Sequence, residues 1–182
     1  MKKIADFKIG ILAILAASLA VVITTAGVLS QAPARSGLKL ILEAQKQVIV
    51  KDENGKNRVS WQAIGETAVV QPGDILLYTV RGEENQKIAV NNFVVTQPIP
   101  TQTMYVLNSA DVVQGVTAKP RIIYSIDGGK TFTENPTIQV TLPDGKVETK
   151  PAPAEVYTHI QYVFDTPIVP RNFQASYQVK VR

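Results

Sequence analysis

The chain of 182 residues contains no cysteine. This absence excludes a disulfide scaffold, a cysteine-ligated zinc or iron–sulfur site and a thiol nucleophile. Histidine is almost absent as well, because His159 is the only one. A serine–histidine mechanism therefore has one candidate base, and a metal site built from several histidines is excluded.

Clusters of charge are also missing, although the formal net charge is +4. Part of that charge comes from the lysines in residues 1–8, and the other basic residues are scattered along the chain. Nucleic-acid binding is typically indicated by basic runs interleaved with aromatic residues, and no such run occurs here. We therefore expect no nucleic-acid partner.

Charged side chains are absent from residues 9–34. A basic start followed by an apolar run is typical of an export signal peptide, and small residues near the end of the run offer cleavage sites. In the alternative interpretation, residues 9–29 remain as an uncleaved signal anchor, because about 20 apolar residues are enough to cross a bilayer. Both interpretations assign residues 1–34 to a hydrophobic N-terminal helix and predict that the rest of the chain is exported. The expected location is the periplasm, the outer envelope or the cell surface, with a membrane anchor if the signal is retained.

Beyond this leader, apolar and polar residues alternate, which indicates β-strands. The alternation is clearest at the C-terminus, where every second residue from Phe173 to Val181 is apolar and predicts a core-facing side. No helical period occurs after residue 35, so residues 36–182 are predicted to form a single domain of strands. The expected strands are 38–50, 58–64, 75–82, 87–97, 103–108, 121–126, 137–142, 156–164 and 172–182.

Turn residues separate these strands. Asn54-Gly55, Pro72-Gly73-Asp74 and Pro143-Asp144-Gly145 are typical of tight connections. Short strands at this spacing predict an all-β fold in which two antiparallel sheets pack as a sandwich.

Five residues match the S-x-D-x-G-x-T-[FW] pattern called the Asp box: Ser125, Asp127, Gly129, Thr131 and Phe132. In such a turn the serine and aspartate side chains bond to local backbone, the glycine takes a strained backbone angle and the aromatic ring packs below. The pattern recurs on the blades of sialidase propellers, but one copy in a chain this short cannot build a propeller. We interpret it as a structural turn.

Other candidate residues lack the partners that chemistry needs. His159 falls on the polar side of its expected strand, and no G-x-S-x-G or similar nucleophile motif accompanies it. Asp127, Asp144, Glu155 and Asp165 could supply oxygen ligands to calcium, but no D-x-[DN]-x-[DN]-G loop occurs. We therefore predict no catalytic residue, no metal site and no cofactor, and we do not expect an enzyme.

Trp61 is the only tryptophan and has two interpretations. Together with Tyr78, Tyr105 and Tyr124 it could form a patch on which a sugar stacks. Alternation within its expected strand favours the other interpretation, an aromatic side chain in the sandwich core. Trp61 is kept as a candidate ligand contact.

Three segments carry a further pattern. Residues 70–80 hold a Pro-Gly-Asp turn and a strand with a tyrosine, residues 90–100 hold a strand rich in valine and asparagine that ends in a proline-containing turn, and Met104-Tyr105-Val106 follows. In this order they resemble the conserved repeat domain family, also called domain of unknown function 11. The stretches 124–132 and 151–160 are similar to extensions found with such domains in bacterial exported proteins. The resemblance implies an immunoglobulin-like sandwich at the bacterial envelope or surface, with no catalytic residues.

These observations predict a non-enzymatic envelope or cell-surface protein with a structural or protein-interaction role. One alternative is a polysaccharide-binding module. Another is a subunit that assembles through edge strands, with either the C-terminal strand or residues 31–37 donated to a neighbour. A glycosidase with paired carboxylates ranks last, because most acidic residues fall in turns. Membrane contact is expected only through residues 9–29, and only if the signal is not cleaved.

Overall fold

The computed structural model describes residues 39–65, 69–83, 90–114, 119–169 and 173–182, so the predicted leader lies outside the described residues. The described part is all-β, and all of its named strands pair antiparallel, as predicted. No helix within it is long and apolar enough to span a membrane. The elements in chain order are β1 (Lys39–Lys51), β2 (Asn57–Ala63), β3 (Ile75–Glu83), β4 (Phe93–Pro98), β5 (Thr103–Tyr105), β6 (Asp111–Gln114), β7 (Arg121–Ser125), β8 (Thr137–Thr141), β9 (Val147–Pro151), the 3-10 turn η1 (Ala154–Val156), β10 (His159–Phe164) and β11 (Gln174–Val181).

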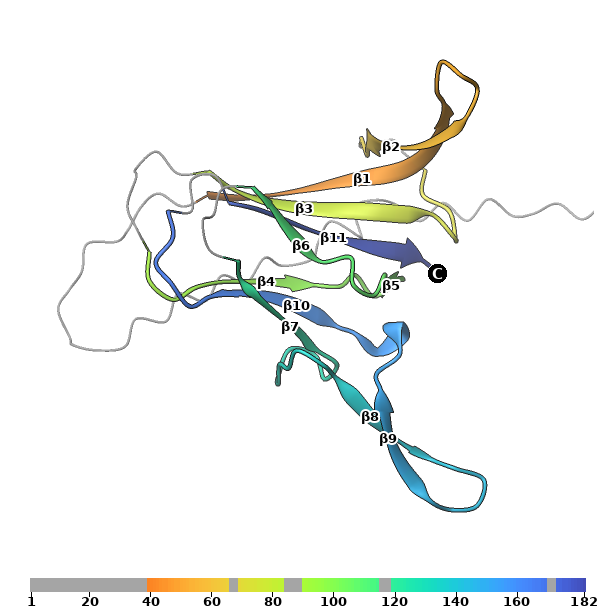
Figure 1. Ribbon diagram of the computed structural model, residues 1–182, viewed down its shortest axis with the longest axis vertical. Coiled ribbons are helices and arrows are strands. Elements are labelled where there is room, and N and C mark those ends of the chain that lie inside the picture. The colour runs from red at the N-terminus through yellow and green to blue at the C-terminus, as the bar shows by residue number, and fades with distance from the viewer. Residues whose placement is uncertain (1–38, 66–68, 84–89, 115–118, 170–172) are drawn as a thin grey trace, which may run out of the picture.

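The larger sheet has the strand order β2-β1-β3-β11-β5, and β6 also pairs with β11 (Figure 1). The hairpin of β1 and β2 turns at the expected Asn54-Gly55, where Gly55 has a φ of +74° that suits glycine. In the register of β3 and β11, Tyr78 lies opposite Tyr177, and the two rings stack with centroids 5.5 Å apart. The alternate residues of β11 are buried, because period-2 geometry turns them all to one side of the sheet.

The smaller sheet has the order β4-β10-β7 (Figure 1). Alternate residues of β10, namely Ile160, Tyr162 and Phe164, are buried, as the sequence pattern predicts. β10 begins at His159, later than the expected residue 156, because η1 precedes it. Pro151 and Pro153 stand before η1 and cannot donate hydrogen bonds to a sheet, which explains the late start.

The core lies between these two sheets and draws buried apolar residues from both. Phe93 and Phe164 of the smaller sheet meet Phe173, which precedes β11, with ring centroids 5.5 to 5.8 Å apart. The Tyr162 hydroxyl donates a hydrogen bond of 2.9 Å to the Ser176 carbonyl, and so links β10 to β11 across the core. Aromatic packing and this hydrogen bond therefore fix the two layers to each other.

The hairpin of β8 and β9 departs from the expected sandwich. It forms a separate two-stranded sheet that projects from the body (Figure 1). Ile138 and Val140 are half-buried and lie outside the core cluster. The alternation around residues 137–142 correctly predicted a strand but gave no information about which sheet the strand joins. The sequence pattern missed β9, because Val147 is its only apolar strand-forming residue and no alternation results, and it also missed the short β6.

The C-terminal strand is not at an edge of the larger sheet. β11 pairs with β3 along one side and with β5 and β6 along the other. Donation of this strand to a neighbour, one of the two routes to assembly considered above, would therefore break hydrogen bonds on both of its sides. Residues 31–37, the other predicted donor, lie outside the described residues.

Candidate functional site

The Asp-box residues form a closed turn at the end of β7. The Ser125 side chain is 1 % exposed, and its Oγ donates to Oδ1 of Asp127 over 2.7 Å. The same Oγ accepts the backbone N–H groups of Asp127 at 3.3 Å and Gly129 at 2.9 Å. In the sequence Ser125 stands between the apolar Tyr124 and Ile126, a position that alternation assigns to the polar side of the strand. The structure buries it, and these hydrogen bonds replace those that water would have made.

Asp127 holds the other half of the turn. Its Oδ1 accepts the backbone N–H groups of Lys130 and Thr131, both at 3.0 Å, and its Oδ2 accepts the Thr131 hydroxyl at 2.6 Å. The hydrogen bonds from Thr131, Ser125 and Lys130 stabilise the ionised carboxylate and hold the pKa of Asp127 far below its usual value. All of these partners belong to the same turn, so the Asp127 carboxylate stabilises the turn.

His159 packs against this turn from β10. Its ring faces Phe132 edge-on, with centroids 6.5 Å apart, and its Nδ1 lies 3.2 Å from the Thr158 hydroxyl oxygen. Burial lowers the pKa of His159, and the negative charge of Asp127 raises it by a smaller amount. The one buried serine nearby, Ser125, already donates its proton to Asp127. The arrangement therefore gives His159 a packing role in the turn.

The remaining acidic candidates lie in different parts of the structure. Asp144 caps the tip of the β8–β9 hairpin, where its Oδ1 accepts the Lys146 N–H at 3.2 Å. Asp165 forms an exposed ion pair with Arg121 at 3.4 Å. Among the described residues, no three histidine, cysteine, aspartate or glutamate side chains gather as a metal site would require.

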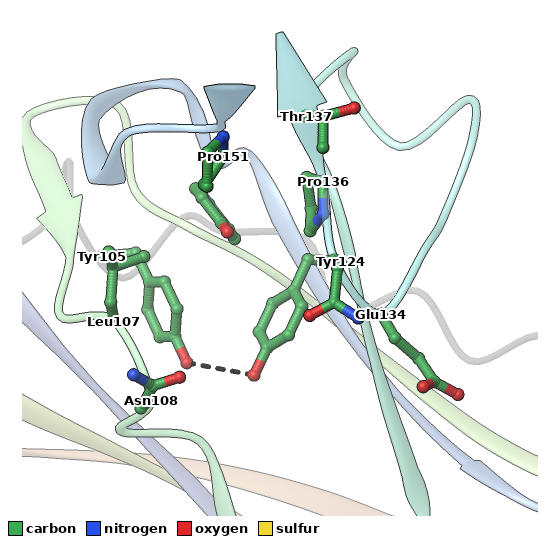
Figure 2. A pocket seen from close by; sticks show the side chains of 10 residues that line it. Tyr105, Leu107, Asn108, Tyr124, Glu134, Pro136, Thr137 and Pro151 are labelled. Atoms are coloured by element: carbon green, nitrogen blue, oxygen red, sulfur yellow. Dashed lines mark hydrogen bonds between the residues drawn. The ribbon is translucent and has the colours of Figure 1, made fainter. Parts of the chain in front are cut away.

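A pocket of about 180 Å³ opens where the base of the β8–β9 hairpin meets the body. Its aromatic wall comes from Tyr105 of β5, Tyr124 of β7 and Tyr157 after η1. The three ring centroids lie 5.4 to 5.6 Å from one another. Figure 2 shows the hydroxyl groups of Tyr105 and Tyr124 pointing toward each other, with the Asn108 side chain beside them. Burial raises the pKa of Tyr124 and of Tyr157, so both phenols are protonated at neutral pH.

The predicted aromatic patch is thus only partly assembled. Tyr105 and Tyr124 do meet, but Tyr78 is buried against Tyr177 in the core, where burial raises its pKa to about 12. Trp61 is half-buried on β2 and belongs neither to the core cluster nor to the apolar residues packed against it. Among the described residues, Trp61 therefore lies neither in the core cluster nor in the lining of this tyrosine pocket, and its role as a ligand contact stays a prediction.

Tyr157 is the pocket tyrosine that the sequence pattern did not single out. The alternation predicts a strand from residue 156, in which Tyr157 shares the outward face of His159. The prolines at 151 and 153 are the sequence feature that indicates its position, because prolines interrupt a strand. The side chains of the residues that follow need not alternate between two faces as they do in a strand.

Trp61 lies instead on the outer face of the larger sheet. It pairs with Gln47, and Ile49 pairs with Val59 two positions further along the β1–β2 hairpin, so the two pairs share one face. Directly opposed residues on antiparallel strands lie on the same face. Ile49 is 60 % exposed and Val59 is 50 % exposed. We call Ile49, Val59 and Trp61 the outer-face apolar group.

Comparisons with known proteins add no relative. The chain matches no protein-family model, no curated protein and no solved structure. The resemblance to the conserved repeat domain family therefore stays a prediction from the motifs.

Proposed function

We propose that this chain is a non-enzymatic, exported module of the bacterial envelope or cell surface that contacts another protein. In this proposal its two sheets form an immunoglobulin-like sandwich of the conserved repeat domain type. The basic, apolar leader supports export. The Asp-box turn supports a structural role, since Ser125 and Asp127 use their hydrogen-bonding capacity within the turn.

The main support for the proposed protein contact is the outer-face apolar group. Ile49 and Val59 expose half or more of their surface although they form a matched cross-strand pair, and the Trp61 ring follows on the same face. Full burial of an isoleucine or valine side chain contributes roughly 1.5 to 3 kcal/mol, and the exposed fraction of each is still available to a partner. Aromatic residues are enriched at the centres of protein interfaces. We infer a partner with a complementary apolar surface, reached by the projecting β1–β2 hairpin.

Photo-cross-linking in the cells that make the protein tests this proposal. A benzophenone amino acid is placed at Val59 and, as a matched control, at Val147, which is 59 % exposed on the β8–β9 hairpin. We expect an adduct of one defined mass from position 59, and its loss when Ile49 is changed to serine. Equal adducts from both positions, or none from position 59 in the folded protein, would contradict the proposed contact.

Assembly into a homo-oligomer is the second candidate. In the described part of the chain β2 pairs only with β1, so its outer edge carries unpaired backbone groups. A second copy could add a strand there. An adduct from position 59 at twice the mass of the chain, with no other adduct, would favour this candidate over a different partner protein.

The state of the leader has its own test. Sequencing the N-terminus of the protein recovered from the native envelope should give a start within residues 31–35 if the signal is cleaved. A start at Met1 would indicate the anchored form. Recovery of the whole protein from the cytoplasm would contradict the proposed export.

A further inference from the structure

The tyrosine pocket lies away from the outer-face apolar group. Tyr105 belongs to β5, and β5 and β2 occupy opposite ends of the larger sheet's strand order. The other walls come from β7, from the start of β8 and from the residues around η1. Binding at this pocket would therefore be independent of the protein contact proposed above.

The aromatic rings form a corner. Tyr124 and Tyr157 are half-buried, and their rings stand at 73° to each other with centroids 5.4 Å apart. Tyr105 is 1 % exposed and packs against both of these rings. Such rings present electron-rich faces, which attract the weakly positive C–H groups on one side of a sugar ring. A flat ring with C–H groups on one side fits this corner.

One hydroxyl at this corner has a proton to donate. The Tyr105 hydroxyl accepts the backbone N–H of Ala110 at 3.1 Å, and its oxygen lies 3.4 Å from the Tyr124 hydroxyl oxygen. The second distance is long for a bond between two hydroxyl groups. The bond between the two hydroxyl groups uses only one of their two protons, and within the described residues no other acceptor is found for the second proton. Tyr124 is the more exposed of the two residues. The Tyr124 hydroxyl can therefore donate to an oxygen atom of a ligand.

The polar residues around the corner are uncharged or acidic. Asn108 and Asn135 supply amide groups, each with donors and an acceptor, and Glu134 supplies a carboxylate at the rim. Among the described residues that line the pocket there is no lysine, arginine or histidine. An anionic ligand such as a phosphate or a uronic acid would have no positive partner here. Sugar hydroxyl groups both donate and accept, so they match the amides.

The size of the pocket limits the ligand. Its volume of about 180 Å³ is below the roughly 300 to 1,000 Å³ typical of sites for drug-sized ligands. The pocket can hold one six-membered ring, and the rest of a chain would extend into solvent. We propose that this pocket binds one neutral pyranose residue of a glycan, with its C–H face on Tyr124 and Tyr157 and its hydroxyl groups on Asn108 and Asn135.

Saturation-transfer NMR on the full-length protein in detergent micelles tests the proposal. The probes are cellotetraose, mannotetraose and chitotetraose, with tetragalacturonate as the anionic comparison and tetramethylammonium as the cationic one. We expect transfer to the ring C–H protons of at least one neutral tetrasaccharide and none to tetragalacturonate. Failure of all three neutral sugars, or transfer only to tetramethylammonium, would overturn the proposal.

Variants then locate the site. Tyr124→Phe removes one hydrogen-bond donor and should weaken binding about three- to tenfold. Tyr157→Ala removes one wall of the corner and should weaken it roughly tenfold or more. Tyr157→Phe keeps the ring and should keep the affinity, which separates a binding effect from a folding effect. Trp61→Ala should leave binding unchanged. Binding that survives Tyr124→Phe and Tyr157→Ala, or that depends on Trp61, would show that the sugar sits elsewhere.

Discussion

Replacement of Gly129 by alanine probes the packing of the Asp-box turn on β10. Gly129 has a φ of +84°, a backbone conformation that costs a residue with a side chain about 1 to 2 kcal/mol. A Cβ at this position would lie 3.3 Å from the His159 ring. The neighbouring Gly128 has nearly the same φ, +79°, but a Cβ there would meet nothing within 4 Å. Gly128→Ala is thus a matched control with the same strain and no contact.

The difference between the two variants isolates the contact with His159. The ring contacts Phe132 on one side and the Thr158 hydroxyl at Nδ1, so it can make room for the Cβ only by rotating about its side-chain bonds. Such a change costs about 0.5 to 1.5 kcal/mol. We expect Gly129→Ala to lower the free energy of unfolding by about 1 kcal/mol more than Gly128→Ala does.

Urea unfolding, followed by tyrosine and tryptophan fluorescence, measures both variants. The same pair is then made in a His159→Ala background, where the extra cost of Gly129→Ala should vanish, because the ring that it meets is gone. Two alanine variants of equal stability in the wild-type background would refute the reasoning. So would an extra cost that persists without the ring, because the contact would then not be its source.

Three further predictions concern the core and the titratable groups. Tyr162→Phe should lower the free energy of unfolding by about 1 kcal/mol, because it removes the hydrogen bond to the Ser176 carbonyl. Tyr78→Phe should leave stability unchanged or raise it by up to about 1 kcal/mol, because the Tyr78 hydroxyl is buried without a partner among the described residues. Equal losses of stability for the two variants in chemical denaturation would contradict this prediction. The folded state lowers the pKa of His159, so the unfolded chain binds the proton more readily and stability should fall as the pH drops below 6.5. His159→Gln should remove this dependence of stability on pH. An unchanged dependence in thermal melts of the variant between pH 5 and pH 7 would argue against the prediction. The folded state also lowers the pKa of Asp127, so the stabilisation of the fold by this carboxylate is present above pH 3.8 and is lost as the pH falls through the lower folded pKa. Asp127→Asn should therefore reduce the melting temperature at pH 7 more than Asp144→Asn does, and this difference should shrink in acid. A difference that does not change with pH would count against the carboxylate's role.

The proposed site shows how far local patterns reach. The sequence pattern identifies Tyr105 and Tyr124 as aromatic candidates, and in the structure their ring centroids lie 5.6 Å apart. It grouped them with Trp61 and Tyr78, which the structure places on an outer face and in the core. It also missed Tyr157, which closes the corner. Residue type marks a side chain as able to stack, but only the packing of the sheets determines which of these side chains meet.

Local features of this protein follow from its sequence alone. Alternation predicts the buried side of β11 from Phe173 to Val181, because neighbouring side chains on a strand must point to opposite faces. The turn at Asn54-Gly55 follows from the backbone freedom of glycine. Each of these properties depends on residues that are close together along the chain.

Tertiary structure decides the order of the strands and everything that depends on it. It places β11 between β3 and the short strands β5 and β6, separates the β8–β9 hairpin from the main sheets, and buries Ser125 beneath its own turn. Strand partners are chosen by how completely the apolar faces of distant segments bury one another. A period of two is the same for every strand and so does not specify which partner each strand takes.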